Sequence, residues 1–360
     1  MPRPLPLELG PELTVAEFNR YSRQLVLPAF GVEGQRRLRA ARVLVLGAGG
    51  LGSPVLLYLA AAGVGTIRVV DFDAVEESNL HRQVIHPTAA IGRSKVASAL
   101  DAVTALNPGV EVVPHEVRLT EENASAVLAG YDVVLDGTDN FPTRYLANDT
   151  CVALGIPLIW ASVLGFAAQV AVFWPAGGGA QLRDLFPDPP EPGTVPNCAE
   201  AGVIGALCGQ VGSIMATEAI KLLTGIGRPL LGRVLVIDAL AGRWDELPLR
   251  RAAPSAARPV VAPVPPGTDE ATLTPTRPLP DGRLLLDVRE PGEFEEGHLP
   301  GSLNLPLGLV LSGADVPRDR PILVICRTGA RAKLAAAALT ARDYDVSVLE
   351  GGLLRFTSAG

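Results

Sequence analysis

Cysteine is scarce in this sequence of 360 residues, which contains only Cys151, Cys198, Cys208 and Cys326. These four are not spaced like a disulfide framework or a CxxC motif, so the sequence indicates a reducing compartment. Basic tracts are also missing, and the formal net charge of −7 argues against nonspecific nucleic-acid binding. These absences exclude a disulfide-stapled secreted domain and a basic nucleic-acid-binding protein.

Patterns typical of a targeting segment or of a membrane span are not found in this sequence either. Residues 1–10 are proline-rich and lack the charged-then-apolar pattern of a signal peptide, so we expect a cytoplasmic protein. The apolar stretch 201–225 is interrupted by Gln210, Glu218 and Lys221. It therefore predicts a buried or dimer-interface helix rather than a membrane span.

The composition predicts two α/β domains. Hydrophobic residues make up 48% of the chain, which is ample for packed cores. An Ala/Pro-rich linker at 251–273 separates a large domain, 1–250, from a small one, 274–360. Alternating strands and helices in the large domain predict a Rossmann-like, mostly parallel sheet with helices on both faces. Its predicted strands are 42–46, 67–71, 132–136 and 157–160, with helices at 52–62 and 94–105; the small domain's strands are 284–286, 322–325 and 346–348.

A glycine-rich loop follows the first predicted strand. The apolar run 43–46 leads into Gly47-x-Gly49-x-x-Gly52 and then a helix, a pattern typical of a phosphate cradle at a helix N-terminus. Asp71 ends the second strand, where a carboxylate can accept hydrogen bonds from a ribose. The same features describe a nicotinamide dehydrogenase, so the loop alone leaves that alternative open.

A cysteine loop in the small domain is the second chemical feature. Cys326-Arg327-Thr328-Gly329-Ala330-Arg331 lies between a predicted strand, 321–325, and a helix, 332–341. Amide N–H groups and the helix dipole at such a turn lower the pKa of a thiol and can hold a persulfide anion. A phosphatase also uses a Cys–Arg loop, but the four residues between Cys326 and Arg331 favour sulfur over phosphate. A purely structural cysteine is the remaining alternative.

From about Arg20 to Asp245 the chain resembles the MoeB/ThiF family of ubiquitin-activating-type adenylyltransferases. Four motifs in family order carry this resemblance: Arg20-Tyr21-Ser22-Arg23-Gln24, the glycine loop, Ser78-Asn79-Leu80-His81-Arg82-Gln83, and Thr138-Asp139-Asn140. The resemblance implies that Mg²⁺ and ATP are used to adenylate the Gly-Gly tail of a ubiquitin-fold sulfur-carrier protein of the MoaD/ThiS type. Adenylation requires positively charged groups near the triphosphate, and the protein itself need not form a covalent bond to the substrate in this step.

The resemblance also implies a role for each motif residue. Arg82 and Lys95 would contact phosphates, Asp139 would hold Mg²⁺, and Arg23 would reach the nucleotide of a neighbouring subunit in a homodimer. Arg82 and Asp139 are thus the expected catalytic residues of this domain. The full nucleotide-binding set that it implies is Gly47, Gly49, Gly50, Gly52, Asp71, Ser78, Asn79, Leu80, His81, Arg82, Lys95, Asp139 and Asn140, with Arg23 from the neighbour.

The chain departs from the family at two places. Many members bind a structural zinc through two CxxC pairs, but 180–183 and the stretch after Leu247 contain no cysteine, so we expect no structural zinc. Cys198 aligns with a cysteine on the family's mobile crossover loop that in some members links covalently to the carrier. In other members that cysteine is dispensable, so its catalytic role stays open.

The segment 274–360 resembles a rhodanese domain. Three motifs agree: 286–290 with 293–294 and 297–302, the cysteine loop, and 349–353. The resemblance implies that Cys326 takes sulfur from a donor, such as a cysteine desulfurase or thiosulfate, and holds it as a persulfide. Arg327, Arg331 and the loop amides would stabilise this anion. Asp287, Arg289 and His298 are expected to be structural ties.

Together the two resemblances predict a fused sulfur-carrier adenylyltransferase and sulfurtransferase. It would make a carrier thiocarboxylate for molybdopterin, thiamine or thiolated-tRNA synthesis, and the sequence does not distinguish these pathways. It also leaves open whether the small domain serves its own large domain or that of a dimer partner. An activating enzyme for ubiquitin-like conjugation through Cys198, and a carrier-binding scaffold without catalysis, remain alternatives.

Overall fold

The computed structural model describes residues 7–190, 202–251, 273, 282–295 and 297–356. The chain divides into two compact units. The large unit comprises Met1–Pro189 with Gly202–Ala256, and the small unit contains Ala257–Gly360. Each unit has its own sheet and its own hydrophobic core. Cys198 and most of the expected linker lie outside the described residues.

The large unit contains an eight-stranded sheet. Its strand order is β3-β2-β1-β4-β5-β6-β7-β8, where the pairings from β3 to β5 are parallel and those from β5 to β8 are antiparallel. The strands are β1 (Arg42–Leu46), β2 (Thr66–Val70), β3 (Glu111–His115), β4 (Val133–Asp136), β5 (Leu158–Leu164), β6 (Ala167–Phe173), β7 (Arg233–Asp238) and β8 (Arg243–Pro248). The mostly parallel α/β fold is confirmed, but the sequence prediction missed β3 and the three antiparallel strands β6–β8.

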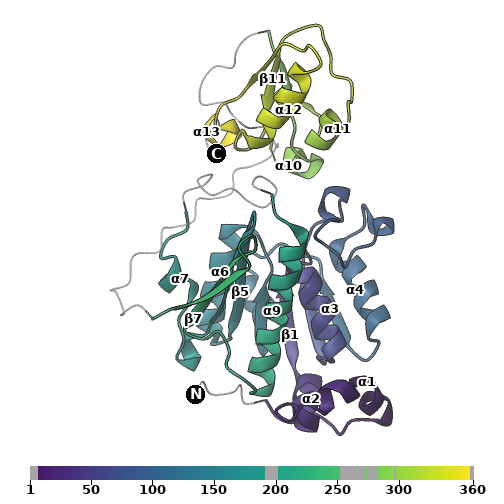
Figure 1. Ribbon diagram of the computed structural model, residues 1–360, viewed down its shortest axis with the longest axis vertical. Helices are drawn as coiled ribbons and strands as arrows, with labels where there is room; N and C mark the ends of the chain where they lie inside the picture. The colour runs from purple at the N-terminus through teal and green to yellow at the C-terminus, as the bar shows by residue number, and fades with distance from the viewer. Residues whose placement is uncertain (1–6, 191–201, 252–272, 274–281, 296, 357–360) are drawn as a thin grey trace. The chain divides into compact units, whose positions relative to one another are not determined.

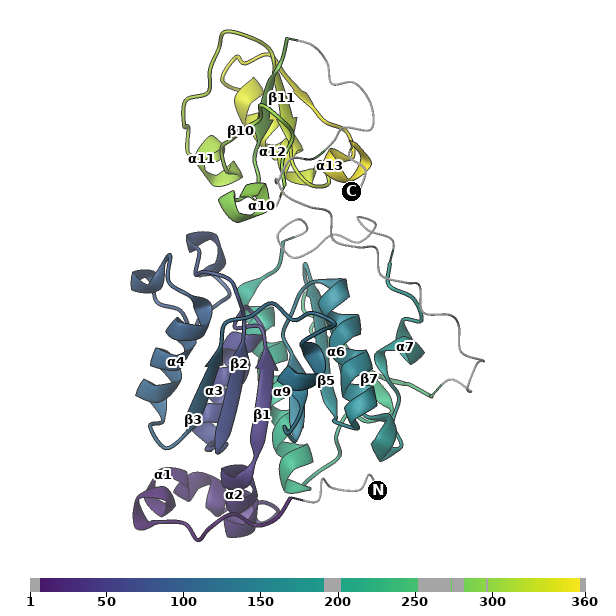
Figure 2. The same cartoon turned by 180° about the vertical axis from the view of Figure 1, so that it is seen from behind.

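Helices cover both faces of this sheet (Figures 1 and 2). One face packs on α3 (Gly52–Ala62), α4 (Lys95–Leu106) and α9 (Gly205–Thr224), and the other on α5 (Ala124–Leu128) and α6 (Phe141–Leu154). Alternation along β1 explains this, because Val43 and Val45 enter one core while Leu44 and Leu46 enter the other. The other helices of the large unit among the described residues are α1 (Val15–Leu25), α2 (Gly31–Ala40), the short α7 (Leu182–Leu185), and the 3₁₀ turns Glu77–Asn79, Thr88–Ala90 and Pro175–Gly177.

The apolar stretch predicted as a buried helix is α9. It contacts α3, β5 and β6, and its inward residues are almost fully buried. None of the described helices is long and apolar enough to cross a membrane. The expectation of a core helix at this position is therefore confirmed.

The small unit is built on a four-stranded parallel sheet of order β10-β9-β11-β12. Its strands are β9 (Leu284–Asp287), β10 (Leu303–Asn304), β11 (Ile322–Ile325) and β12 (Val346–Val348). Its helices are α10 (Pro291–Glu295), α11 (Leu307–Leu311), α12 (Ala330–Thr340) and α13 (Gly352–Phe356). Buried β11 ends one residue before Cys326, and α12 begins four residues after it.

Candidate functional site

The glycine loop forms a tight cradle between β1 and α3. Gly47 has φ +86°, which favours glycine, and a β-carbon on Gly52 would lie 1.9 Å from the carbonyl oxygen of Gly47. The loop is tied to β2, because the amide of Ala48 donates to Asp71 Oδ2 at 2.8 Å. These contacts hold the backbone in the form that lets it approach a phosphate at the start of α3.

Asp71 lies at the C-terminal end of β2 and is buried. Its other oxygen, Oδ1, accepts a hydrogen bond from the amide of Asp73 at 2.9 Å. Burial raises the pKa of Asp71, while the nearby Lys95 and the backbone amides partly oppose that effect. Each carboxylate oxygen keeps a second lone pair, so the group can tie the glycine loop and still accept a ribose hydroxyl.

Two cations gather near this cradle. Lys95 starts α4 and is buried, and its Nζ lies 2.7 Å from Asp73 Oδ2. Arg82 donates from Nη2 to Asn79 Oδ1 at 2.6 Å and from Nη1 to the carbonyl of Ser78 at 3.2 Å. Asn79 thus positions Arg82, a contact that the sequence did not reveal. The sequence prediction also missed Asp73 as the partner of Lys95.

The rest of the Ser-Asn-Leu-His-Arg motif forms the turn that carries Arg82. Ser78 and Asn79 lie in the 3₁₀ turn Glu77–Asn79, and Leu80 follows it. His81 Nε2 lies 2.9 Å from Arg82 Nη1, and burial followed by the charge of Arg82 lowers the pKa of His81. The turn therefore places the imidazole of His81 beside the guanidinium of Arg82.

Asp139 and Asn140 follow β4. In the sheet, β2 and β3 lie on one side of β1, and β4 and β5 lie on the other, so the strand order switches between β1 and β4. Ligands of open α/β sheets bind at such a point. Asn140 caps α6, because its Oδ1 accepts from the amide of Thr143 at 3.0 Å. Asp139 is exposed, and no hydrogen bond or ion pair holds its carboxylate within the part of the chain that the structure describes.

Metal-binding capacity at this edge is modest. Among the described residues there is no group of three or more His, Cys, Asp or Glu that could hold a metal ion. Mg²⁺ at nucleotide sites is usually held by one or two carboxylates together with substrate phosphates. The open carboxylate of Asp139 fits that limited donor set.

Polar contacts occupy the position at which relatives of the expected family bind zinc. Asn148 Nδ2 donates to Gln181 Oε1 at 3.2 Å, and the amide of Leu182 donates to Asn148 Oδ1 at 2.9 Å. Arg183 forms two bonds to Asp149, from Nε at 3.0 Å and from Nη2 at 2.7 Å. These contacts join α6 to α7.

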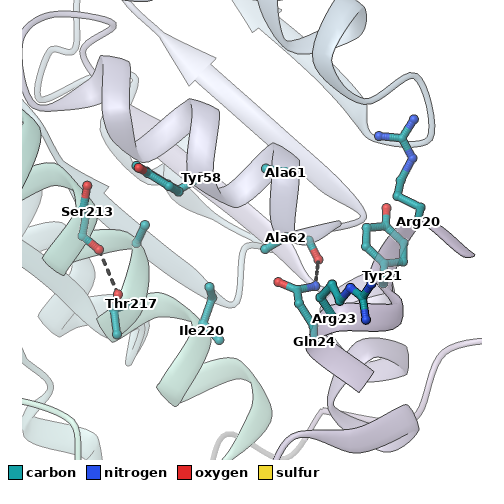
Figure 3. Close-up of a pocket in the computed structure, with 11 residues that line it drawn as sticks. Arg20, Tyr21, Arg23, Gln24, Tyr58, Ala61, Ala62, Ser213, Thr217 and Ile220 are labelled. Atoms are coloured by element: carbon teal, nitrogen blue, oxygen red, sulfur yellow. Dashed lines mark hydrogen bonds between the residues drawn. The ribbon is translucent and has the colours of Figure 1, made fainter. Parts of the chain in front are cut away.

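Arg23 lies at a distance from the glycine loop of its own chain. It lines a pocket of about 470 Å³ between α1, α3 and α9, together with Tyr58 and Thr217 (Figure 3). The pocket residues Ala61 and Ala62 are at the C-terminal end of α3, whereas the glycine loop precedes its N-terminal end. Because an eleven-residue helix is about 16 Å long, Arg23 and the cradle lie at opposite ends of α3.

Cys326 lies at the centre of the small unit's loop and is buried. Its Sγ accepts hydrogen bonds from the amide of Gly329 at 3.1 Å and from that of Ala332 at 3.4 Å. Arg327, Thr328 and Ala330 complete the turn into α12. The loop amides therefore converge on the sulfur, as the strand-to-helix position predicted.

Arg331 pairs with a carboxylate that the sequence did not indicate. Its Nη1 and Nη2 donate to the two carboxylate oxygens of Glu293 at 2.6 and 2.7 Å. Burial raises the pKa of Glu293, but the hydrogen bonds and charge of Arg331 outweigh it and lower that pKa overall. The charged terminal nitrogens of Arg331 are thus committed to Glu293, which lies 38 positions earlier and was not predicted as a partner.

The remaining motif residues of the small unit make structural contacts. Arg289 forms a buried ion pair with Asp287, with Nη2 and Oδ2 2.7 Å apart. The ring of His298 stacks on Phe294 with centroids 3.9 Å apart, and its Nδ1 lies 3.0 Å from the Phe294 carbonyl oxygen. These contacts brace the segment that carries Glu293. In the large unit, Cys151 and Cys208 are buried in α6 and α9 as packing residues.

Comparison with known proteins gives a match to each unit. Residues 21–258 match the ThiF family, and residues 276–359 match the rhodanese-like domain. The chain is 48% identical over 373 residues to a probable adenylyltransferase/sulfurtransferase MoeZ of Mycobacterium tuberculosis, covering 97% of this chain and 95% of that protein. It is 54% identical over 242 residues to a sulfur carrier protein adenylyltransferase of Thermus thermophilus, covering 66% of this chain and 89% of that one.

Two further relatives extend the comparison. The adenylyltransferase and sulfurtransferase MOCS3 of Sus scrofa is 40% identical over 402 residues, covering 98% of this chain and 88% of that protein. A crystal structure of Escherichia coli MccB with ATP superimposes with a TM-score of 0.58 at 22% identity, covering 65% of this chain and 72% of that one. The latter likeness supports the fold of the large unit alone.

Proposed function

Because this chain belongs to the ThiF family and also carries a rhodanese-like domain, we propose that it is an adenylyltransferase and sulfurtransferase for a sulfur-carrier protein. The carrier would be a small ubiquitin-fold protein with a Gly-Gly end. The observation that carries the proposal is that one chain has both the nucleotide cradle with Arg82, Lys95 and Asp139 and the amide-lined Cys326 loop. Full-length relatives named for both activities support it.

The adenylation step requires little from the protein beyond placement and charge. The carboxylate of the carrier's last glycine attacks the α-phosphorus of ATP, and pyrophosphate leaves. Arg82 and Lys95 supply positive charge for the phosphates, Asp71 accepts hydrogen bonds from the ribose, and Asp139 would hold Mg²⁺. Bound Mg²⁺ supplies further charge neutralisation of the phosphates. Since Lys95 is paired with Asp73, ATP must compete with that carboxylate for the ammonium group.

The sulfur step would use Cys326. Its thiolate takes a sulfane sulfur from a donor such as a cysteine desulfurase or thiosulfate and becomes a persulfide. The terminal sulfur then attacks the acyl adenylate and displaces AMP, which forms a carrier–CO–S–S–Cys326 bond. An external thiol cleaves the S–S bond, which releases the thiocarboxylate and leaves Cys326 in a disulfide with that thiol. The amides of Gly329 and Ala332 are placed to stabilise the anionic sulfur.

Pyrophosphate exchange tests the first step. Purified protein should exchange labelled pyrophosphate into ATP only when a suitable Gly-Gly-ended carrier is present. A Cys326→Ala variant should retain this exchange and lose thiocarboxylate formation. If thiocarboxylate forms normally without Cys326, the proposed sulfur route is wrong. If instead Cys198→Ala alone abolishes transfer of the carrier to lysines, the conjugation alternative is correct.

A homodimer with a shared site is part of the proposal. Arg23 lies at the far end of α3 from its own cradle, so it can act at a nucleotide only in a second copy. Arg23→Ala and Lys95→Ala variants should each be inactive alone. A mixture should regain about a quarter of the wild-type sites, since half of the random dimers are mixed and each has one intact site. A mixture that stays inactive would exclude the shared site. The requirement for ATP suits a cytoplasmic enzyme, and molybdopterin, thiamine and tRNA thiolation remain the candidate pathways.

A further inference from the structure

Thr138, the residue immediately before Asp139, is held at every polar group. Its amide and its hydroxyl both donate to Asp136 Oδ1, at 3.0 and 2.6 Å. Its carbonyl oxygen accepts from Arg144 Nε at 3.2 Å and from Arg144 Nη2 at 2.9 Å. Loop segments are usually more mobile than the elements they connect, whereas this loop residue is hydrogen-bonded at its amide, its hydroxyl and its carbonyl group.

Both side chains that hold Thr138 are charged types buried in the large unit. Asp136 is 0% exposed and Arg144 is 6% exposed. The second oxygen of Asp136, Oδ2, has no hydrogen-bond partner within the part of the chain that the structure describes. Burial raises the pKa of Asp136, and the charge of Arg144 opposes it. Removing charged groups from water is costly, so an apolar core would be the more stable choice at this position.

Arg144 connects three elements at this point. It lies on α6, its Nη1 donates to Ser162 Oγ on β5 at 3.2 Å, and its guanidinium lies 5.9 Å from the ring centre of Trp160. The loop after β4 is therefore bound to the helix that follows it and to the neighbouring strand. On the other side of Asp139, Asn140 is fixed as the cap of α6. Asp139 is thus the open side chain between two fixed neighbours.

We propose that Asp136 and Arg144 are positioning residues for adenylation, which clamp Thr138 so that the carboxylate of Asp139 faces the nucleotide. The inference rests on the proposed function of the large unit. In this interpretation, Asp136 and Arg144 stay buried despite the cost in folding free energy because they orient the carboxylate of Asp139. Their effect is indirect, because both act through Thr138 and neither is assigned a contact with ATP.

The experiment compares four full-length proteins: wild type, Arg144→Met, Arg144→Lys and Tyr145→Phe. Tyr145→Phe is the matched control, since it removes one hydrogen bond from α6 to the carbonyl of Phe186 and none from Thr138. Pyrophosphate exchange gives kcat and KM, calorimetry gives ATP affinity at several Mg²⁺ concentrations, and thermal unfolding reports stability.

Arg144→Met should lower the exchange kcat by about 10- to 100-fold and raise the Mg²⁺ concentration needed for tight ATP binding. Arg144→Lys, which keeps a donor for the Thr138 carbonyl, should recover part of both effects. Tyr145→Phe should change stability alone. Equal kcat and Mg²⁺ dependence in Arg144→Met and Tyr145→Phe would overturn the proposal.

A second pair of variants covers the case in which Arg144→Met does not fold. Thr138→Val removes the hydroxyl bond to Asp136 with little change in shape, and Thr138→Ser keeps it. Reduced kcat and weaker Mg²⁺-dependent ATP binding in the valine variant only would support the clamp, and equal behaviour of the two would contradict it. Failure of the proposed function is distinguishable, because wild type itself would then exchange no pyrophosphate with any carrier.

Discussion

Replacing Glu293 by glutamine tests how the Cys326 loop is held. The substitution keeps the size of the side chain but removes the charge that pairs with Arg331. Breaking a buried ion pair by removing one partner costs about 3–5 kcal/mol, because the other charge is left buried and uncompensated. The Glu293 side chain is 22% exposed and that of Arg331 is 9% exposed, so the pair is partly screened. We therefore expect the small unit to lose about 2–3 kcal/mol of unfolding free energy.

The three tryptophans make this loss measurable in the intact protein. Trp160, Trp174 and Trp244 all belong to the large unit, so tryptophan fluorescence follows that unit alone while far-UV circular dichroism follows both. In urea, the midpoint of the small unit's dichroism transition should fall by about 2–3 M for a slope of about 1 kcal/mol/M. The fluorescence transition should stay in place.

Controls separate the loss of charge from the loss of contact. The double variant Glu293→Leu with Arg331→Met should recover much of the lost stability, because it leaves no charge unpaired. The effect should also depend on pH: the pKa of Glu293 is lowered in the folded protein, so its stabilisation is present above the ordinary glutamate pKa and lost as pH falls through the folded value. Superimposable urea curves for wild type and Glu293→Gln at pH 7 would refute this account.

Three other substitutions probe the large unit. Gly52→Ala should abolish ATP binding and lower the free energy of unfolding by about 3 kcal/mol, because the new β-carbon overlaps the Gly47 carbonyl. The same change at Gly209, which faces open space, should raise the free energy of unfolding by about 0.5–1 kcal/mol. Calorimetry measures ATP binding, and urea titration measures stability. Burial lowers the pKa of His86 in the folded protein. The free energy of unfolding should therefore fall as pH drops below about 6.5, because the unfolded chain takes up the proton first. A His86→Gln variant whose stability has the same pH profile as wild type would disprove this. Asp149→Asn breaks the exposed ion pair with Arg183 and should lower the free energy of unfolding by about 0.5–1 kcal/mol. Because we expect no structural zinc, a chelator should leave the melting temperature unchanged. Near-stoichiometric zinc in the purified protein would contradict that expectation.

Local sequence patterns predicted four of the five parallel strands of the large sheet (β1, β2, β4 and β5) and strand β11 of the small unit. β1, α3 and β11 begin and end at the predicted residues, because each is a strongly apolar or helix-forming run bounded by glycine or polar residues. β3 and β8 could not be predicted in this way. Pro114 interrupts β3, and every residue of β8 is exposed, so neither shows an alternating apolar pattern.

The candidate site shows a similar division. Sequence motifs predicted the residue types at the cradle and the cysteine loop, and the structure has Asp71, Arg82 and Lys95 around the glycine loop. The direction in which each side chain points could not be predicted from the sequence. Whether Arg331 turns toward a persulfide or toward Glu293 depends on a residue 38 positions away, and no periodic pattern records such a pair.

The two borders of the eight-stranded sheet limit how copies of this chain can associate. At one border, Pro114 removes a backbone donor from β3, and at the other, β8 carries the exposed charges of Arg243, Asp245 and Glu246. Proline and charge on an outer strand discourage the addition of a strand from another molecule. Two copies would thus not merge their sheets into one continuous ribbon. The shared site proposed above would instead bring copies together through helices such as α1, α3 and α9, which surround the pocket that contains Arg23.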